Sequence, residues 1–429
     1  METIRLLGSM QEGSSRAFKF SASASVSQYL KSDSLRVDFG ADVSDVPNSV
    51  WNIIFVANFL PWAWWFDAEI QVDELDADFY DCIPSVVEGY KKMYPRWEIK
   101  GCVKANNILA NHNHDANRSA AFYSGGLDAV ETMLLHFDEK PDLLTLWGAD
   151  ISYDNEDGWA VMRDNVKSSV DLVGLENIII KSNFRFIEKE NDLHQLVLPI
   201  LGDGWWHGIK HALPLLGMAA PLAYKRGYKN VYIASTHCEG MGMVTCASNP
   251  WTDNQVRFCG CSAVHDSYNH SRQDKAMTVV RECEKRRLKM PMHVCWRTQT
   301  GDNCCKCEKC YRTIAELLIE GADPVEYGFA DYVKEFTFKK VTKLLRRTFH
   351  AENAMGRKDL NFIWSQSKPR IKKRESILRE GEYWPIFKWL LDHDLMSNKS
   401  ITMPFEDRFA SVKQRVRRML SKIKRTIVP

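Results

Sequence analysis

Residues 120–135 read AAFYSGGLDAVETMLL, an apolar run that leads through two glycines into a segment with helical spacing. The pattern predicts a buried strand at Ala120–Tyr123 and a helix at Asp128–Phe137, joined by a sharp turn. Glycines permit positive φ angles and close backbone approach to a ligand, and the first amides of a helix attract anions. The turn therefore indicates a phosphate site, although an ordinary strand-turn-helix junction would carry the same residues.

Strands and helices alternate downstream of this turn. Strands are predicted at Leu143–Trp147, Asn177–Lys181 and Val231–Ser235, and helices at Trp159–Leu172 and Gly208–Arg226. Such alternation is typical of βαβ units, and so of an α/β fold with a doubly wound parallel sheet. Ligands of such folds bind at the carboxyl ends of the strands.

Two further regions flank this core. Residues 1–117 predict an N-terminal α+β unit, with a strand at Leu35–Phe39 and an amphipathic helix from Phe79 to Tyr90. The apolar segment Val50–Phe66 is too short and too interrupted to span a membrane, and predicts a buried strand or sheet edge. Residues from Asp331 onward predict a helical and basic C-terminal region, with 24 Lys and Arg against 11 Asp and Glu.

The twelve cysteines favour metal binding over disulfides. No secretory signal is visible at the N-terminus, so a cytoplasmic location is expected, and the cytosol keeps thiols reduced. Four of the cysteines follow the spacing C-x₈-C-x₂-C-x₂-C, which suits tetrahedral Zn²⁺ with no open position. An iron–sulfur cluster and a redox pair are the alternatives. The expected zinc ligands are Cys295, Cys304, Cys307 and Cys310.

The turn and the cysteines together resemble a known family. Ser124–Asp128 resembles the Ser-Gly-Gly-x-Asp-Ser loop of the PP-loop ATP pyrophosphatases, and the cysteine spacing is similar to the zinc knuckle of the 7-cyano-7-deazaguanine synthases within that superfamily. The resemblance covers residues 119–321 and departs at Ala129, a serine in the family, and at Cys305, commonly a glycine there. The implied fold is adenine nucleotide alpha hydrolase-like. Together with the flanking regions, which lie outside the resemblance, the predicted domains are 1–117 (α+β), 118–290 (ATP-binding), 291–330 (zinc knuckle with the adjoining helix) and 331–429 (basic and helical).

The resemblance implies an ATP-dependent, AMP-forming ligase. A small-molecule carboxylate or amide would be adenylated with release of pyrophosphate, and a nucleophile would then displace AMP. ATP would be bound by Ser124, Gly125, Gly126, Leu127 and Asp128. Ser124 and Asp128 would also be catalytic, the latter by holding Mg²⁺ against the phosphates.

Other charged and polar residues complete the expected site. Arg272 and Lys275 lie three residues apart on a predicted helix and would neutralise phosphate charge during catalysis, although solvated surface charges would follow the same pattern. Substrate binding is expected after the strand Val231–Ser235, where parallel sheets present ligands. The candidates there are His237, Asp253 and Arg257.

Two alternatives to a small-molecule ligase follow from the same residues. One is an RNA-modifying PP-loop enzyme that binds RNA through its basic C-terminal region, for which sulfur transfer would draw on Cys259, Cys261 or Cys305. The other is a zinc-bearing adaptor that binds nucleotide without turnover, as the departure at Ala129 allows. The amphipathic segment Phe409–Ile427 could contact a membrane surface, RNA or a protein, or pack on the body. A homodimer is a further expectation.

Overall fold

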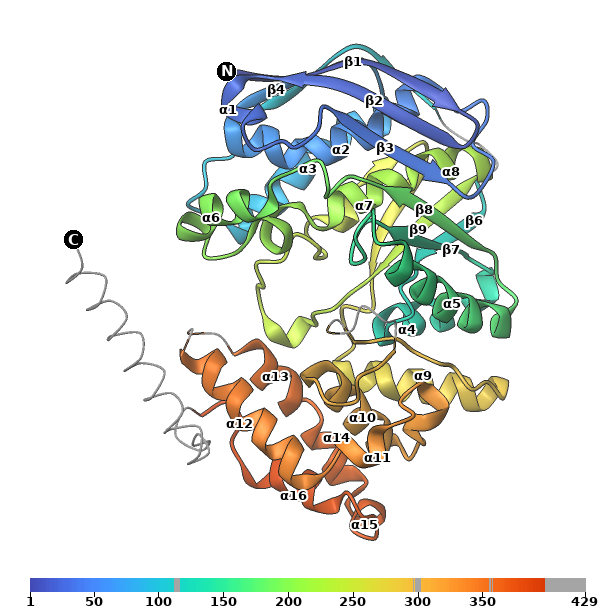
Figure 1. Ribbon diagram of the computed structural model, residues 1–429, viewed down its shortest axis with the longest axis vertical. Coiled ribbons are helices and arrows are strands. Elements are labelled where there is room, and N and C mark those ends of the chain that lie inside the picture. The colour runs from blue at the N-terminus through green and yellow to red at the C-terminus, as the bar shows by residue number, and fades with distance from the viewer. Residues whose placement is uncertain (112–115, 296, 298–301, 355, 357, 398–429) are drawn as a thin grey trace, which may run out of the picture. The chain divides into compact units, whose positions relative to one another are not determined.

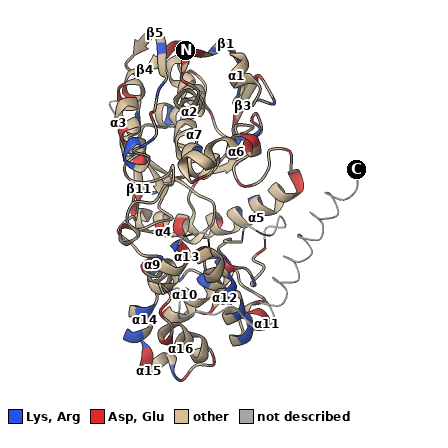
Figure 2. Cartoon of the chain, turned by 90° about the vertical axis from the view of Figure 1, so that its left-hand side faces the viewer, with Lys and Arg blue, Asp and Glu red and all other residues tan. Residues whose placement is uncertain are grey.

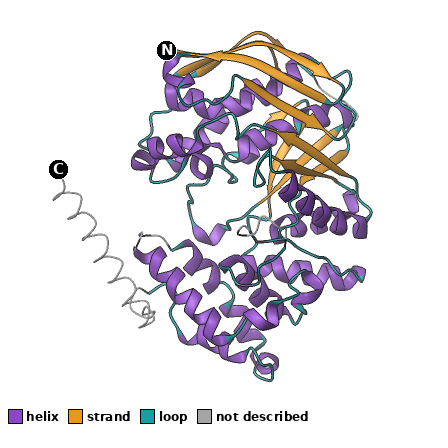
Figure 3. Ribbon diagram, viewed as in Figure 1, coloured by secondary structure: helices purple, strands orange, loops and turns teal. Residues whose placement is uncertain are grey.

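The computed structural model describes residues 1–111, 116–295, 297, 302–354, 356 and 358–397 (Figure 1). The predicted helix at Phe409–Ile427 lies outside these residues. The chain forms two compact units, which are Met1–Ser271 with Arg281–Asp302 (unit 1) and Arg272–Val280 with Asn303–Pro429 (unit 2). Every strand of the described chain belongs to unit 1, and the described part of unit 2 is helical (Figure 3).

Unit 1 is built on one eleven-stranded sheet with the order β10-β11-β9-β6-β7-β8-β3-β2-β1-β4-β5. The strands are β1 (Glu2–Glu12), β2 (Ser15–Ala22), β3 (Ser34–Phe39), β4 (Ala68–Asp76), β5 (Cys102–Leu109), β6 (Arg118–Phe122), β7 (Asp142–Trp147), β8 (Asn177–Ser182), β9 (Tyr228–Ala234), β10 (Arg257–Phe258) and β11 (Cys261–Asp266). The helices of this unit are α1 (Ala24–Ser27), α2 (Asn48–Phe66), α3 (Ala77–Met93), α4 (Leu127–Leu135), α5 (Glu156–Val173), α6 (Glu190–Leu201), α7 (Ala212–Met218) and α8 (Ala220–Arg226).

Five neighbouring strands, β11, β9, β6, β7 and β8, are parallel to one another. Among these five strands, the central strand β6 comes first in the sequence. The next two, β7 and β8, lie on one side of β6, and the last two, β9 and β11, lie on its other side. The strand order therefore reverses between β6 and β9, which is where ligands bind in open α/β sheets. The prediction of an α/β protein with a largely parallel sheet is confirmed.

Helices cover both faces of these parallel strands. Alternate residues of a strand point to opposite faces. On one face Ala120, Leu144 and Val231 belong to the hydrophobic core that also contains α2, α7 and α8. On the other face the hydroxyl of Tyr123 donates a hydrogen bond of 2.8 Å to Ser169 Oγ of α5. The sheet is thus buried on both sides, as parallel sheets are.

The N-terminal strands continue the same sheet. β3 pairs antiparallel with β8, and β2, β1, β4 and β5 follow outward. The predicted boundary between residues 117 and 118 therefore does not separate two compact units. Pairing with β3 satisfies the backbone hydrogen-bonding groups of β8 that would otherwise lie on an exposed sheet edge. The two strands are far apart in the sequence, so local sequence patterns could not predict this contact.

The segment Val50–Phe66 is a helix, and its prediction as a strand was wrong. It forms most of α2, which is buried from Ser49 to Trp64 and packs against β4 and α7. A helix buried on all sides has no polar face, so its sequence shows no helical period. Length is then the better guide, since 19 residues are too many for an ordinary strand.

The predicted long helix at Gly208–Arg226 is divided into three. A π-helix spans Trp205–Lys210, followed by α7 and α8. Pro221 lies in the first turn of α8, where its missing N–H and fixed φ favour a helix start over a helix interior. The other predicted strands and helices of the parallel core are confirmed, with shifts of a few residues at their ends.

The described part of unit 2 is helical, as predicted for the chain after Asp331. Helix α9 (Arg272–Arg286) begins in this unit. The helices that follow the cysteine-rich segment are α10 (Glu308–Glu320), α11 (Tyr332–Glu335), α12 (Phe338–Ala354), α13 (Asp359–Ser365), α14 (Lys368–Lys373), α15 (Glu375–Leu378) and α16 (Trp384–Asp392). Lysines and arginines mark α12 and α14 (Figure 2). Among the described helices, none has the length and apolar character needed to cross a bilayer.

Candidate functional site

The Ser124–Asp128 loop joins β6 to α4 at the carboxyl end of the central parallel strand. The start of the loop is fixed by the preceding residue, Tyr123. The backbone carbonyl of Tyr123 accepts a hydrogen bond of 2.9 Å from Thr145 Oγ1. Gly125 has φ +71°, in the left-handed region, and Gly126 returns to φ −76° as the N-cap of α4. The two glycines therefore make the sharp turn that the sequence predicted.

The side chains of the loop differ in exposure. Ser124 is exposed, whereas Asp128 is half-buried in the first turn of α4. The carbonyl of Gly125 accepts a hydrogen bond of 2.8 Å from the N–H of His293, which fixes the turn from outside the helix. The first N–H groups of α4 have no acceptor within the helix. This backbone arrangement is the one that binds anions at helix N-termini.

The two glycines should tolerate alanine differently. A methyl group at Gly125 would meet no atom within 4 Å, so the penalty of Gly125→Ala is backbone strain at positive φ, roughly 1–2 kcal/mol. At Gly126 the methyl would lie 3.5 Å from Ser124 Oγ and 3.7 Å from the His293 carbonyl, which are ordinary contacts. We expect Gly126→Ala to change the free energy of unfolding by under about 0.5 kcal/mol. Urea denaturation of both variants measures the difference, and equal losses would contradict this account of the turn.

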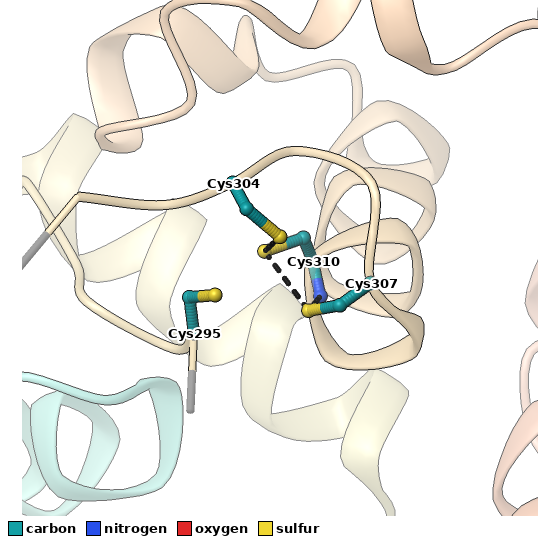
Figure 4. Close-up of side chains that lie close together, drawn as sticks. All are labelled: Cys295, Cys304, Cys307 and Cys310. Atoms are coloured by element: carbon teal, nitrogen blue, oxygen red, sulfur yellow. Dashed lines mark hydrogen bonds between the residues drawn. The ribbon is translucent and has the colours of Figure 1, made fainter. Parts of the chain in front are cut away.

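The four predicted zinc ligands come together. The Sγ atoms of Cys295, Cys304, Cys307 and Cys310 all lie within 4.8 Å of one another (Figure 4). The Cys304 and Cys310 sulfurs are 3.9 Å apart, and those of Cys307 and Cys310 are 3.4 Å apart. Thiolates about 2.3 Å from one ion would be separated by similar distances. The cluster could therefore hold a metal ion such as zinc.

Cys305 lies outside the cluster and has a structural role. Its φ is +52°, a conformation that glycine adopts most easily, and its Sγ donates to the carbonyl of Asn303. The glycine expected at this position from the resemblance is thus explained by backbone geometry. Cys307 has a second function in the cluster, because it is the N-cap of α10 and its Sγ accepts from the N–H of Cys310.

His237 and Asp253 are linked by a chain of hydrogen bonds. Asp253 Oδ2 accepts from His265 Nδ1 at 2.8 Å, and His265 Nε2 lies 2.8 Å from Ser235 Oγ. The Ser235 hydroxyl in turn donates to the carbonyl of His237 at 2.6 Å. Asp253 is only 1% exposed, so this carboxylate orients the network from the interior, and its role in substrate binding stays a prediction. His237 is half-buried, whereas Arg257, on β10, is exposed.

Arg272 and Lys275 are not solvated surface charges. Both are buried in the first turns of α9, at 8% and 1% exposure. Within unit 2 the Arg272 guanidinium lies 3.3 Å from the carboxylate of Glu316 and 3.2 Å from Thr313 Oγ1. This ion pair gives Arg272 a structural function in its own unit. The role of either residue in phosphate binding stays a prediction.

The Cys259 and Cys261 pair is explained by a hairpin. Cys259 and Gly260 both have positive φ and form the two-residue turn between β10 and β11, the geometry of a type I′ turn. Burial is the main influence on both thiols and raises the pKa of each well above its ordinary range. Both sulfurs are therefore protonated and buried, which makes them poor candidates for sulfur transfer.

A second cluster, which we call the Cys246 cluster, was missed by the sequence analysis. It consists of Asp203, His207, His237 and Cys246. His207 Nδ1 lies 2.8 Å from Asp203 Oδ2, and the centroids of the His207 and His237 rings are 6.1 Å apart. Burial would raise the pKa of the Cys246 thiol, but the two histidines outweigh it and lower the pKa to about 5. The sequence offered only one signal, histidines four residues apart at positions 207 and 211, and no spacing connected them to a cysteine some forty residues later.

Comparison of the chain with models of protein families gives no match, and comparison with curated proteins gives none either.

Proposed function

We propose that this protein is an ATP-dependent, AMP-forming ligase of the PP-loop type, with a small-molecule carboxylate or amide as the group that is adenylated. The observation that carries the proposal is the position of the Ser124–Asp128 loop. It follows the central strand of a parallel sheet, at the point where the strand order reverses, and its glycines turn directly into the N-terminus of α4. This is where an α/β protein of this topology binds a phosphorylated ligand.

Different residues of the loop would bind the phosphates of ATP and the Mg²⁺ ion. The backbone N–H groups at the start of α4 bind the pyrophosphate end, and the exposed Ser124 hydroxyl donates to a phosphate oxygen. Asp128, on the first turn, would hold Mg²⁺, which neutralises charge on the departing pyrophosphate. Catalysis of this kind depends on positioning and charge stabilisation.

The neighbouring strand β9 supports a substrate-binding region next to the loop. β9 runs parallel to β6, so the segments that follow their carboxyl ends leave the sheet at the same edge. His237 lies just after β9, held by the hydrogen bond from Ser235. A substrate oxygen near His237 would therefore be at the same sheet edge as the phosphate loop.

Incubation of the full chain with α-labelled ATP, Mg²⁺, ammonium and a metabolite extract tests the proposal. We expect labelled AMP and stoichiometric pyrophosphate that depend on a component of the extract. Gly126→Ala, which should fold normally, is expected to weaken ATP binding because its methyl group narrows the space beside Ser124 Oγ. ATP binding without any cleavage at the α-phosphate would instead favour a nucleotide-binding zinc adaptor.

An RNA-modifying enzyme is the second candidate, and the basic character of unit 2 favours it. α12 carries Lys339, Lys340, Lys343, Arg346 and Arg347, and lysines and arginines also dominate α14. Phosphate backbones bind such surfaces with strong salt dependence. AMP formation that requires added RNA and falls steeply between about 50 and 200 mM salt would support this candidate over the small-molecule ligase.

A further inference from the structure

We propose that His270 is the general base for the displacement of AMP, in which its Nε2 atom removes a proton from the attacking amine, and that Glu131 is the positioning residue that orients the His270 ring. The catalytic role rests on the proposed ligase function. The arrangement itself follows from contacts among residues of unit 1.

Glu131 and His270 form a carboxylate–histidine pair. His270 Nδ1 lies 2.6 Å from Glu131 Oε1, and the Glu131 side chain is fully buried. An ionised carboxylate only accepts hydrogen bonds, so Nδ1 carries a proton and the lone pair of the neutral ring lies on Nε2. A buried carboxylate that fixes the tautomer of a histidine in this way is a recurring feature of histidine bases.

The second ring nitrogen of His270 is available. Its Nε2 atom makes no hydrogen bond to any residue that the structure describes. The His270 side chain is 30% exposed, so a small molecule can reach the ring. His136 and His265 also contact carboxylates, but both ring nitrogens of each are already hydrogen-bonded. His270 therefore has the free nitrogen that a base needs and these two histidines lack.

The pair lies beside the residues proposed to bind ATP. Glu131 follows Asp128 by three residues on α4, and residues with this spacing share a helix face, with Cβ atoms about 5–6 Å apart. Asp128 lies in the first turn of α4, directly after the phosphate loop. Through its contact with Glu131, His270 is held within one helical turn of the proposed Mg²⁺ ligand.

The loop that carries His270 is fixed on two sides. It begins at Asp266, at the carboxyl end of β11, and Asp266 Oδ2 accepts a hydrogen bond of 2.8 Å from Thr132 Oγ1 of α4. On the other side the carbonyl of Tyr268 accepts a hydrogen bond of 2.8 Å from the N–H of Glu239, in the segment that follows β9. The loop therefore connects the helix of the phosphate loop with the region proposed to bind substrate.

This location suits a base in the second half of the reaction. The amine nitrogen uses its lone pair to form a bond to the adenylated carbon, and the carbon–oxygen bond to AMP breaks, with the electron pair leaving on AMP. The surplus proton of the amine moves to His270 Nε2, and the imidazolium later releases it to solvent. General-base catalysis of this kind contributes about 10²–10⁴ in rate.

Diethyl pyrocarbonate tests the available nitrogen with no ATP present. The reagent acylates unprotonated ring nitrogens, and peptide mass mapping of the full chain locates the product. We expect His270 to react at least about tenfold faster than His265, because the His265 side chain is 2% exposed and reacts only when the structure opens locally. Equal rates at the two histidines would overturn the proposal.

Catalysis is tested with His270→Ala, α-labelled ATP, Mg²⁺ and a metabolite extract, using two nucleophiles. With ammonium we expect AMP formation to fall by about 10²–10⁴ and to recover in part when imidazole is added. With hydroxylamine, which attacks activated acyl groups without a base, the rate should stay within about threefold of wild type. His350→Ala, an exposed histidine of α12, should behave as wild type with both nucleophiles.

Glu131→Gln tests the positioning residue at nearly constant size. The glutamine amide can donate to Nδ1, which moves the ring proton to Nε2 and removes the base, so the loss should again be confined to ammonium. Equal losses with both nucleophiles in His270→Ala, or wild-type turnover with ammonium, would refute the base. A wild-type chain that reacts with diethyl pyrocarbonate as expected but forms no AMP with either nucleophile would contradict the ligase function, and the catalytic role of His270 with it.

Discussion

Asp128→Asn is expected to lower AMP formation from α-labelled ATP by about 100-fold or more, with folding preserved. The substitution keeps the size of the side chain but removes the charge that would hold Mg²⁺, and loss of one group that stabilises transition-state charge usually reduces turnover by about 10²–10³. Asp128 lies in the first turn of α4, where the negative charge of a carboxylate interacts favourably with the helix dipole. A small loss of stability should therefore accompany the change.

A matched control separates these effects. Asp138 follows α4, and its side chain is 94% exposed and lies 3.7 Å from Arg286. Asp138→Asn removes the same charge away from the loop and should leave AMP formation unchanged. Thermal denaturation of both variants shows whether the folded population is comparable. Wild-type turnover by folded Asp128→Asn protein would remove Asp128 from the mechanism.

Cys307→Ser should abolish metal binding and destabilise the part of the chain around α10. Serine is a good N-cap, so this variant keeps the cap of α10 and removes only the thiolate ligand. Structural zinc in small modules contributes on the order of 10 kcal/mol of apparent binding free energy, so we expect a loss of at least about 3 kcal/mol in the free energy of unfolding. Elemental analysis and urea denaturation measure the two effects.

Cys305→Ser serves as the control for the four-cysteine cluster. Cys305 follows Cys304 in the sequence and is buried. Its Sγ donates a hydrogen bond to the carbonyl of Asn303 and is not one of the four clustered sulfurs. We expect this variant to retain about one metal ion per chain, as wild type should. Treatment of wild type with a chelator should reproduce the instability of Cys307→Ser. Equal metal content in the two serine variants would mean that Cys307 is not a ligand.

Residue spacing allowed the local parts of the candidate site to be predicted. The turn needs a positive φ angle at Gly125 followed by a helix start at Gly126. Both requirements are met by residues that are adjacent in the sequence, so the turn could be predicted locally. The four clustered cysteines include three within seven residues, so their meeting point follows largely from chain connectivity. The α2 helix could not be predicted in the same way, because burial on every side removes the periodicity that identifies a helix.

The sequence by itself determined the alternation of strands and helices, the glycine turn at Ser124–Asp128 and the set of four cysteines, because each depends on residues close together along the chain. Only the tertiary structure decided that the N-terminal strands extend the same sheet, that Asp253 is buried in a hydrogen-bond network, and that the N–H of Ala247 reaches the carbonyl of His207. These contacts join segments far apart in sequence. Their formation depends on burial and pairing across the whole of unit 1, which no local pattern records.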